Sequence, residues 1–157
     1  MTVSILFVCL GNICRSPLAE AALRAEAEQA GLDLVVDSAG TGGWHAGQAP
    51  DPRAIAAARR QGVDISHLRA RKVAPADFER FDRIVALDAE NYADLAAMRP
   101  PGGRATLSLL LDAVPGRAGQ GVADPYYGGD ADFDETWREV SSGARHLVAT
   151  LTAESIA

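Results

Sequence analysis

Short apolar runs and helix-forming stretches alternate along this chain. The apolar runs are rich in β-branched and aromatic residues, which is typical of buried strands. They cover residues 3–8, 34–36 and 84–87. The stretches between them are rich in alanine and other helix formers. Those cover residues 17–30, 52–61 and 91–98. Residues 107–111 fit a fourth strand or a helical turn equally well, because periodicity does not separate the two in so short a run.

Residues that start and stop helices support these boundaries. Ser16 and Pro17 form an N-cap and first-turn pair, and Gly31 can end the helix that they begin. The Asp-Pro pair at 51–52 starts the next helix, with Gly62 as its stop. Near the end of the chain, apolar residues recur at helical three- and four-residue steps and predict a helix packed on the core. This stripe comprises Phe133, Trp137, Val140, Ala144, Leu147 and Leu151.

Strands separated by helices indicate an α/β fold, in which a parallel sheet is covered by helices on both faces. In such sheets the ligand site lies beyond the carboxyl ends of the strands. The loop after the first strand is therefore the first place to look for chemistry. It contains both cysteines of the chain, Cys9 and Cys14.

Composition narrows the class of protein. The chain has 157 residues, 48% hydrophobic and 23% charged, so we expect one globular domain over residues 1–157. A net charge of −6 disfavours nucleic acid as a partner, because phosphate backbones attract a basic face. No apolar run reaches the ~18–20 residues of a membrane span. The absence of a secretory signal predicts a cytoplasmic protein, with leaderless secretion as the open alternative. Two cysteines are too few for a disulfide scaffold or a four-cysteine zinc site.

The loop from Cys9 to Pro17 has the composition of an anion-binding nest. Gly11 and Asn12 tolerate positive φ and let backbone N–H groups converge at the start of a helix. Arg15 adds a planar fork for two phosphate oxygens. A thiol in such a setting ionises near neutral pH, which would make Cys9 a nucleophile beneath a bound oxyanion. The competing interpretation is that Cys9 is a small buried hydrophobe and Arg15 a surface residue.

Residues 8–17 closely resemble the signature of the low-molecular-weight protein tyrosine phosphatases. The resemblance continues in Asp-Ser-Ala-Gly-Thr at 37–41, Trp-His at 44–45 and Asp-Pro-Arg-Ala at 51–54. Asp-Pro-Tyr-Tyr at 124–127 is similar to the general-acid loop of that family. The resemblance implies a single domain with a four-stranded parallel sheet and helices on both faces. It also implies a metal-independent phosphatase that uses no cofactor.

The family mechanism implies catalytic roles for three residues. Cys9 would attack phosphorus and form a phosphocysteine, while Arg15 and backbone N–H groups hold the phosphate oxygens. Asp124 would protonate the phenolate leaving group and then activate water. By composition alone three other aspartates are equally plausible as the acid, namely Asp88, Asp112 and Asp130. Asp124 is therefore chosen by the motif match. The implied phosphate-binding residues are Leu10, Gly11, Asn12, Ile13, Cys14, Arg15 and Ser16.

Four polar residues are implied as supports of this loop. Ser16 would hydrogen-bond the Cys9 sulfur in addition to capping its own helix. Asn12 would brace the loop through a buried network with Ser38 and His67. The segment around His67 carries one residue more than the His-x-Ala-Arg spacing of the family. An ordinary surface or core histidine is therefore the alternative.

Aromatic residues are expected to line the substrate pocket. Trp44, Tyr126 and Tyr127 would sandwich a phenyl ring, with contacts worth about 0.5–1.5 kcal/mol each, or would simply be partly buried. A deep aromatic slot favours phosphotyrosine, because phosphoserine is too short to reach the nest. Leu10 and Ile13 lie at the rim of the loop and either tune selectivity or pack.

The second cysteine, Cys14, follows Cys9 by five residues. In the family such a pair can form a reversible disulfide that protects the nucleophile from over-oxidation. The competing interpretation is that Cys14 is inert packing.

Two other functions fit the same fold. A thioredoxin-coupled arsenate reductase also uses a Cys-x5-Arg loop, but it needs further resolving cysteines, and none follows Cys14. A non-catalytic phosphotyrosine-binding module would need neither the thiol of Cys9 nor the acid of Asp124. We therefore expect a monomeric phosphatase for phosphotyrosine-containing proteins. Its product, inorganic phosphate, should also inhibit it, and neither nucleic acid nor a membrane is an expected partner.

Overall fold

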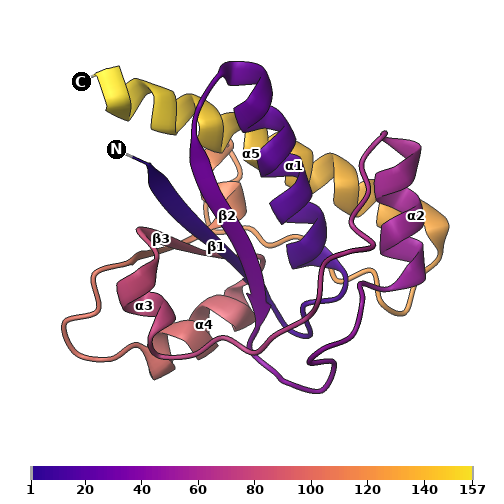
Figure 1. Cartoon of the computed structure of the whole chain (residues 1–157), viewed down its shortest axis with the longest axis horizontal. Coiled ribbons are helices and arrows are strands. Elements are labelled where there is room, and N and C mark those ends of the chain that lie inside the picture. Colours follow the sequence, from indigo (N-terminus) through magenta and orange to yellow (C-terminus); the bar gives the residue numbers. More distant parts are fainter. Residues whose placement is uncertain (1, 157) are drawn as a thin grey trace.

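The computed structural model describes residues 2–156 and has an α/β fold built on one sheet (Figure 1). Its strands are β1 (Val3–Cys9), β2 (Leu34–Gly40), β3 (Arg83–Ala86) and β4 (Thr106–Leu109). They lie in the order β2-β1-β3-β4, and each neighbouring pair runs parallel. The expected four-stranded parallel sheet is confirmed.

Helices cover both faces of this sheet, as predicted. They are α1 (Arg15–Ala30), α2 (Pro52–Arg60), α3 (Asp77–Arg80), α4 (Ala89–Met98), α5 (Asp130–Ile156) and the 3-10 turn η1 (Leu110–Ala113). Helices α1, α2 and α5 share one hydrophobic core with one face of the sheet, and α3 and α4 share a second core with the other face (Figure 1).

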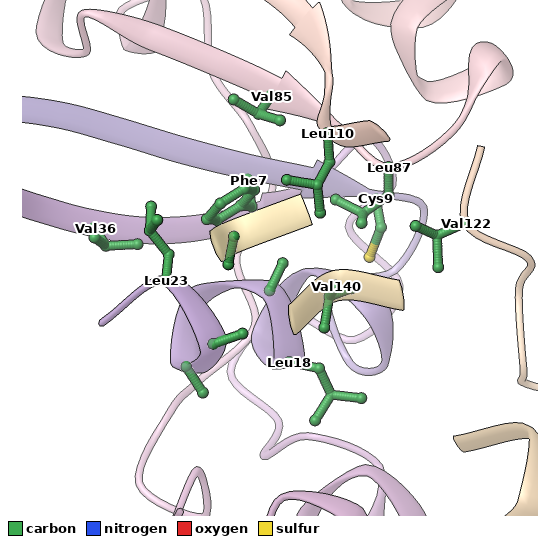
Figure 2. Packing of buried hydrophobic residues seen from close by; sticks show 14 of the residues in the cluster. Phe7, Cys9, Leu18, Leu23, Val36, Val85, Leu87, Leu110, Val122 and Val140 are labelled. Atoms are coloured by element: carbon green, nitrogen blue, oxygen red, sulfur yellow. The ribbon is translucent and has the colours of Figure 1, made fainter. Parts of the chain in front are cut away.

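The side chains of β1 alternate between these two cores. Ile5, Phe7 and Cys9 belong to the core under α1 and α5, whereas Leu6 and Val8 belong to the core beside α3 and α4. A central strand that is buried on both faces needs a continuous apolar run, which is what residues 3–8 supply. Figure 2 shows Cys9 at the carboxyl end of β1, where its side chain belongs to the larger core.

Several predicted boundaries need correction. Strand β2 does not end at residue 36 but continues to Gly40, because residues 37–40 keep their pairing with β1. The ambiguous run 107–111 contains both alternatives, since β4 ends at Leu109 and η1 follows it. The short helix α3 was not predicted, because four residues are too few to show a period.

The ends of the helices follow the expected chemistry with one exception. Gly31 ends α1 in the left-handed conformation, with a φ of 66°. The Asp51 carboxylate accepts a hydrogen bond from the Arg53 N–H at 2.8 Å and caps α2. Helix α1, however, begins at Arg15, so Ser16 lies inside it and is not its N-cap.

The stripe predicted for the last helix packs on the core, with five of its six members buried and Trp137 partly buried. Within residues 2–156, none of the helices combines the length and the hydrophobicity that a transmembrane segment requires. The carboxyl ends of β1 and β2 lead into the loops that carry the predicted chemistry.

Candidate active site

The segment from Cys9 to Arg15, called the cradle loop below, joins β1 to α1. Asn12 has a φ of 57°, the only positive value at a non-glycine position within residues 2–156. This confirms the expected left-handed turn at an asparagine. Gly11 does not have positive φ. It is instead crowded by His45, whose Cδ2 would lie 3.0 Å from a Cβ atom at position 11.

The cradle loop turns its carbonyl groups outward. The carbonyl oxygens of Cys9, Leu10 and Ile13 accept hydrogen bonds of 2.8–2.9 Å from backbone N–H groups of neighbouring segments. The donors are Thr41, Gly42 and Asp51. In a planar trans peptide, the N–H that follows a carbonyl points in the opposite direction. The N–H groups of Leu10, Gly11 and Cys14 are therefore aimed into the loop, as in an anion-binding nest.

Gly40, the last residue of β2, packs directly against the cradle loop. A Cβ atom at this position would lie 2.8 Å from the carbonyl oxygen of Leu10 and 3.1 Å from the backbone nitrogen of Asn12. Both neighbours are backbone atoms and cannot rotate away. A glycine is therefore required if the cradle loop is to keep this shape.

Cys9 is buried, with 3% of its surface exposed, and its Sγ lies 3.0 Å from Ser16 Oγ. The contact between this hydroxyl and the sulfur, which the family resemblance implied, is present. Ser16 does not cap α1 as expected, because its side chain turns into the cradle loop instead of toward the first-turn N–H groups. Cys14 occupies the N-cap position and makes no capping hydrogen bond from its side chain. The start of the helix thus keeps its donors for another acceptor.

Asn12 braces the cradle loop through three side-chain hydrogen bonds. Its Nδ2 donates to Ser16 Oγ at 2.8 Å and to Ser38 Oγ at 3.0 Å. Its Oδ1 accepts from the Arg71 N–H at 3.0 Å. Ser38 in turn donates to Glu20 Oε1 at 2.8 Å. The contact of Asn12 with Ser38 that the resemblance implied is present, and the contact with Ser16 is an addition that was not predicted.

His67 is not part of this network, so its predicted role as a support is wrong. Its side chain is exposed and lines a separate surface groove. The segment between the histidine and the Ala-Arg pair at 70–71 is one residue longer than the family spacing, so the resemblance does not fix where this side chain lies. The place next to Ser38 belongs to Glu20, which is 2% exposed and receives a hydrogen bond of 2.8 Å from Arg24. No residue pattern predicts a buried Glu20, because a glutamate in a helix usually faces solvent.

Arg15 is a buried residue with 3% exposure, which excludes the surface interpretation. Its Nη1 donates to Asp88 Oδ2 at 2.6 Å and to the Val122 carbonyl at 2.9 Å, while Nη2 lies 3.6 Å from Asp124 Oδ2. Burial lowers the pKa of Arg15, but Cys9 and the two aspartates raise it by more. The guanidinium is therefore charged and fixed in orientation.

Two aspartates approach Arg15 from different segments. Asp88 caps α4, accepting from the Asn91 N–H at 2.7 Å, and is 27% exposed. Asp124 is 43% exposed, accepts from the Tyr126 N–H at 3.1 Å and lines the same cavity as Cys9. Of the four aspartates weighed, Asp124 is thus the one that lines the same cavity as the thiol. Two others lie elsewhere, in η1 and at the start of α5: Asp112 and Asp130.

A cavity of about 270 Å³ opens above the cradle loop. Its deep end is formed by buried residues, among them Cys9 and Arg15. His45, which was not predicted, lines this cavity. So do all five predicted pocket residues, which are Leu10, Ile13, Trp44, Tyr126 and Tyr127. Trp44 and Tyr127 are 70% and 96% exposed, so they frame the mouth of the cavity and do not form a closed sandwich.

Cys14 is buried beside the same cavity. Burial raises the pKa of Cys14 far above that of an ordinary thiol, and the nearby charges of Asp51, Cys9 and Asp124 raise it further. Cys14 therefore stays protonated at neutral pH. The spacing of two cysteines does not reveal this difference, which comes from the surrounding fold.

Replacing Asn12 with alanine is expected to destabilise the protein by about 2–4 kcal/mol. The change removes three hydrogen bonds and places an ordinary residue at positive φ. Asn12→Gly loses the same bonds but tolerates the backbone, so it should be about 1 kcal/mol more stable than Asn12→Ala. Urea unfolding of both variants measures the difference. Equal stabilities would show that the left-handed turn is not strained.

Comparisons with known proteins agree with this geometry. The family model described as low molecular weight phosphotyrosine protein phosphatase matches residues 4–156. The low molecular weight phosphotyrosine protein phosphatase of Schizosaccharomyces pombe is 40% identical over 95% of this chain and 97% of its own.

Solved structures show the same likeness. A protein tyrosine phosphatase from Entamoeba histolytica has a TM-score of 0.92 at 33% identity, over 98% of this chain and 99% of its own. The drosophila arginine phosphatase DARP has a TM-score of 0.88 at 29% identity, over 94% and 96%. A family model that spans nearly the whole chain and a relative at 40% identity show that this chain belongs to the low-molecular-weight phosphotyrosine protein phosphatases, a family of hydrolases.

Proposed function

We propose that this protein hydrolyses phosphotyrosine in proteins through a phosphocysteine intermediate. The observation that carries the proposal is the convergence of Cys9, Arg15 and Asp124 on one cavity. A buried thiol, a buried guanidinium and an exposed carboxyl group supply a nucleophile, an anion clamp and an acid. The aromatic side chains at the mouth suit a phenyl ring whose phosphate reaches the cradle loop.

In the first step the Cys9 thiolate attacks phosphorus in line with the phenolic oxygen. The S–P bond forms while the P–O bond breaks, and Asp124 gives its proton to the leaving oxygen. The inward N–H groups and Arg15 hold the three remaining oxygens. Because Nη1 of Arg15 is engaged by Asp88 and Val122, the Nη2 and Nε donors are oriented before substrate arrives.

In the second step water attacks the phosphorus of the phosphocysteine. The Asp124 carboxylate takes a proton from this water, and the S–P bond breaks to release inorganic phosphate. The Ser16 hydroxyl, at 3.0 Å from the sulfur, stabilises the departing thiolate. Neither step uses a divalent metal. The product, inorganic phosphate, competes with substrate for the cradle loop.

The protective disulfide between Cys9 and Cys14 stays a prediction. It would form when a peroxide oxidises the Cys9 thiolate to a sulfenic acid and the Cys14 thiolate then attacks the Cys9 sulfur, which forms the S–S bond and releases hydroxide. Because the pKa of Cys14 is raised, little thiolate is present at neutral pH, so this reaction should be slow. Alkaline conditions should speed it.

The substrate class is tested with three phosphorylated compounds in the presence of a metal chelator. We expect turnover of a phosphotyrosine peptide and much slower turnover of a phosphoserine peptide and of phosphoarginine. Preference for phosphoarginine would assign the chain the activity named for the drosophila protein, and dependence on a divalent metal would overturn the mechanism. Reduction of arsenate would assign the reductase function, and binding without turnover would leave a phosphotyrosine-binding module.

We also propose that the protein acts as a monomer in the cytoplasm. The cavity is complete within one chain, since every group used in the two steps comes from residues 9–127 of the same molecule. Light scattering during turnover tests the monomer, and cell fractionation tests the location.

Replacing Asp124 with asparagine is expected to lower kcat/KM for phenyl phosphate by about 10²-fold. Asparagine keeps the shape of the side chain but has no proton to give to the phenolate. The loss should shrink for p-nitrophenyl phosphate, whose phenolate leaves more easily without an acid. Asp130→Asn, which lies at the start of α5 away from the cavity, is the matched control. Equal losses on both substrates would remove Asp124 from the role of acid.

A further inference from the structure

We propose that Arg53 is a positioning residue that sets the place of Asp124 by fastening the segment 124–128, called the acid loop below, to the start of α2. This inference rests on the proposed role of Asp124 as the acid. Arg53 itself does not line the cavity and does not touch the reacting atoms.

The Arg53 guanidinium is bonded directly to the backbone of the acid loop. Its Nη1 donates to the Gly128 carbonyl at 2.9 Å, and its Nη2 donates to the Tyr126 carbonyl at 2.9 Å. A planar fork is suited to holding two carbonyl groups at once. The guanidinium also lies over the rings of Tyr126 and Phe133, with its Cζ 5.7 and 4.6 Å from their centroids. Since Phe133 is fully buried, one side of the fork rests on the core.

The residue whose carbonyl group Arg53 holds is also the residue whose N–H contacts the acid. Tyr126 receives the Arg53 bond on its carbonyl and donates its own N–H to Asp124 Oδ1 at 3.1 Å. Among the described residues this is the one hydrogen bond recorded for the Asp124 carboxyl group, which is 43% exposed and 3.6 Å from Arg15. The place of Asp124 therefore depends on where the Tyr126 backbone sits.

The start of α2 also contacts the cradle loop. The Asp51 N–H donates to the Ile13 carbonyl at 2.8 Å. The Asp51 carboxylate accepts from Arg53 Nε at 3.1 Å and from Nη2 at 3.0 Å. Burial raises the pKa of Asp51, but the hydrogen bonds from Arg53 lower it by more, so the pair stays ionised at neutral pH. Asp51 and Arg53 thus connect the loop that carries the nucleophile with the loop that carries the acid.

The same helix offers a matched control. Arg60, at the other end of α2, donates to Asp134 Oδ1 on α5 at 3.0 and 2.6 Å. It fastens α2 to α5 through these hydrogen bonds, whereas Arg53 reaches α5 through the ring of Phe133, and the bonds of Arg60 go to Asp134 and not to the acid loop. If Arg53 only stabilised α2, then Arg53→Gln and Arg60→Gln should change the same properties.

The test compares kcat/KM for phenyl phosphate and p-nitrophenyl phosphate in Arg53→Gln, Arg53→Lys and Arg60→Gln. We expect Arg53→Gln to lower kcat/KM for phenyl phosphate by about 10-fold or more, because a poor leaving group depends most on protonation by a correctly placed acid. The loss on p-nitrophenyl phosphate should be much smaller. Arg53→Lys, whose ammonium can reach one carbonyl but cannot span two, should fall between Arg53→Gln and wild type. Arg60→Gln should match wild type on both substrates.

Coupling to Asp124 is measured in a double-mutant cycle. In the Asp124→Asn background, Arg53→Gln should cause little further loss on phenyl phosphate, since the acid is already gone. Equal losses on the two substrates, or a full additional loss in the Asp124→Asn background, would overturn the proposal. Should Arg53→Gln fail to fold, the same comparisons with Arg53→Lys decide the matter.

An assay that needs no catalysis separates this inference from the proposed function. Hydrogen exchange at the Tyr126 and Gly128 amides should be faster in Arg53→Gln than in Arg60→Gln and wild type, because the acid loop has lost its anchor. Suppose that exchange is faster in Arg53→Gln but that Asp124→Asn has the same kcat/KM for phenyl phosphate as wild type. Arg53 would then hold the acid loop, and Asp124 would not be the acid. Unchanged exchange would show that Arg53 does not hold the loop.

Discussion

Replacing Cys9 with serine is expected to abolish turnover and to leave phosphate binding in place. A serine hydroxyl is not ionised at neutral pH and is a much weaker nucleophile than a thiolate, so kcat should fall by about 10⁴-fold or more. The inward N–H groups and Arg15 do not depend on the sulfur and should still bind the anion. Steady-state assays of p-nitrophenyl phosphate measure the loss, and titration with inorganic phosphate measures the binding.

Cys14→Ser is the matched comparison for this variant. It changes the other cysteine of the cradle loop but keeps the backbone N–H that faces the anion, so it should lose far less activity. Turnover that survives in Cys9→Ser but not in Cys14→Ser would reverse the two assignments. A Cys9→Ser protein that no longer binds phosphate would show that the substitution disturbs the cradle loop itself.

The cradle loop could be predicted from the sequence because its interactions are local. The strand, the left-handed turn at Asn12 and the start of α1 all lie within a few residues of one another. Local residue types are enough to indicate such a turn and a nearby helix N-terminus. The sheet could be predicted for a similar reason, since strands and helices alternate with clear changes of pattern.

The partners of Arg15 could not be predicted. Asp88 is 73 residues away in the chain and Val122 is 107 residues away, and only the folded sheet brings them to the guanidinium. Gly121 shows the same dependence on the fold. A Cβ atom there would lie 2.8 Å from the Asp88 Cβ, so the approach of the segment before the acid loop to the start of α4 requires a glycine that no local pattern explains.

The hydrogen-bond network of Asn12 could be predicted only in part from the family resemblance. Ser16 contacts the Cys9 sulfur and Ser38 contacts Asn12, as the resemblance implied. His67 lies in a segment whose spacing departs from the family pattern, and its side chain is on the surface. The Ser38 hydroxyl donates to Glu20, a contact that the resemblance did not imply.

Replacing Arg15 with lysine is expected to lower kcat/KM by about 10³-fold or more. The guanidinium spans Asp88 and Val122 through Nη1 while its other nitrogens remain for the phosphate. A lysine ammonium is a single point of charge and cannot make both sets of bonds. Loss of the clamp on the transferring phosphoryl group removes stabilisation that is largest in the transition state, which is where such groups contribute about 10³–10⁵-fold.

The competing explanation is that Arg15→Lys only destabilises the fold, because a charge at a position with 3% exposure loses its partners. Arg59→Lys, on the exposed end of α2, controls for the general effect of the exchange. Inhibition by inorganic phosphate separates the two explanations. If Arg15 clamps the anion, phosphate should inhibit Arg15→Lys much more weakly than wild type, even where circular dichroism shows the variant to be folded. Phosphate inhibition as strong as in wild type would mean that the inward N–H groups hold the anion alone, and that Arg15 serves the transition state or the fold but not the bound ground state.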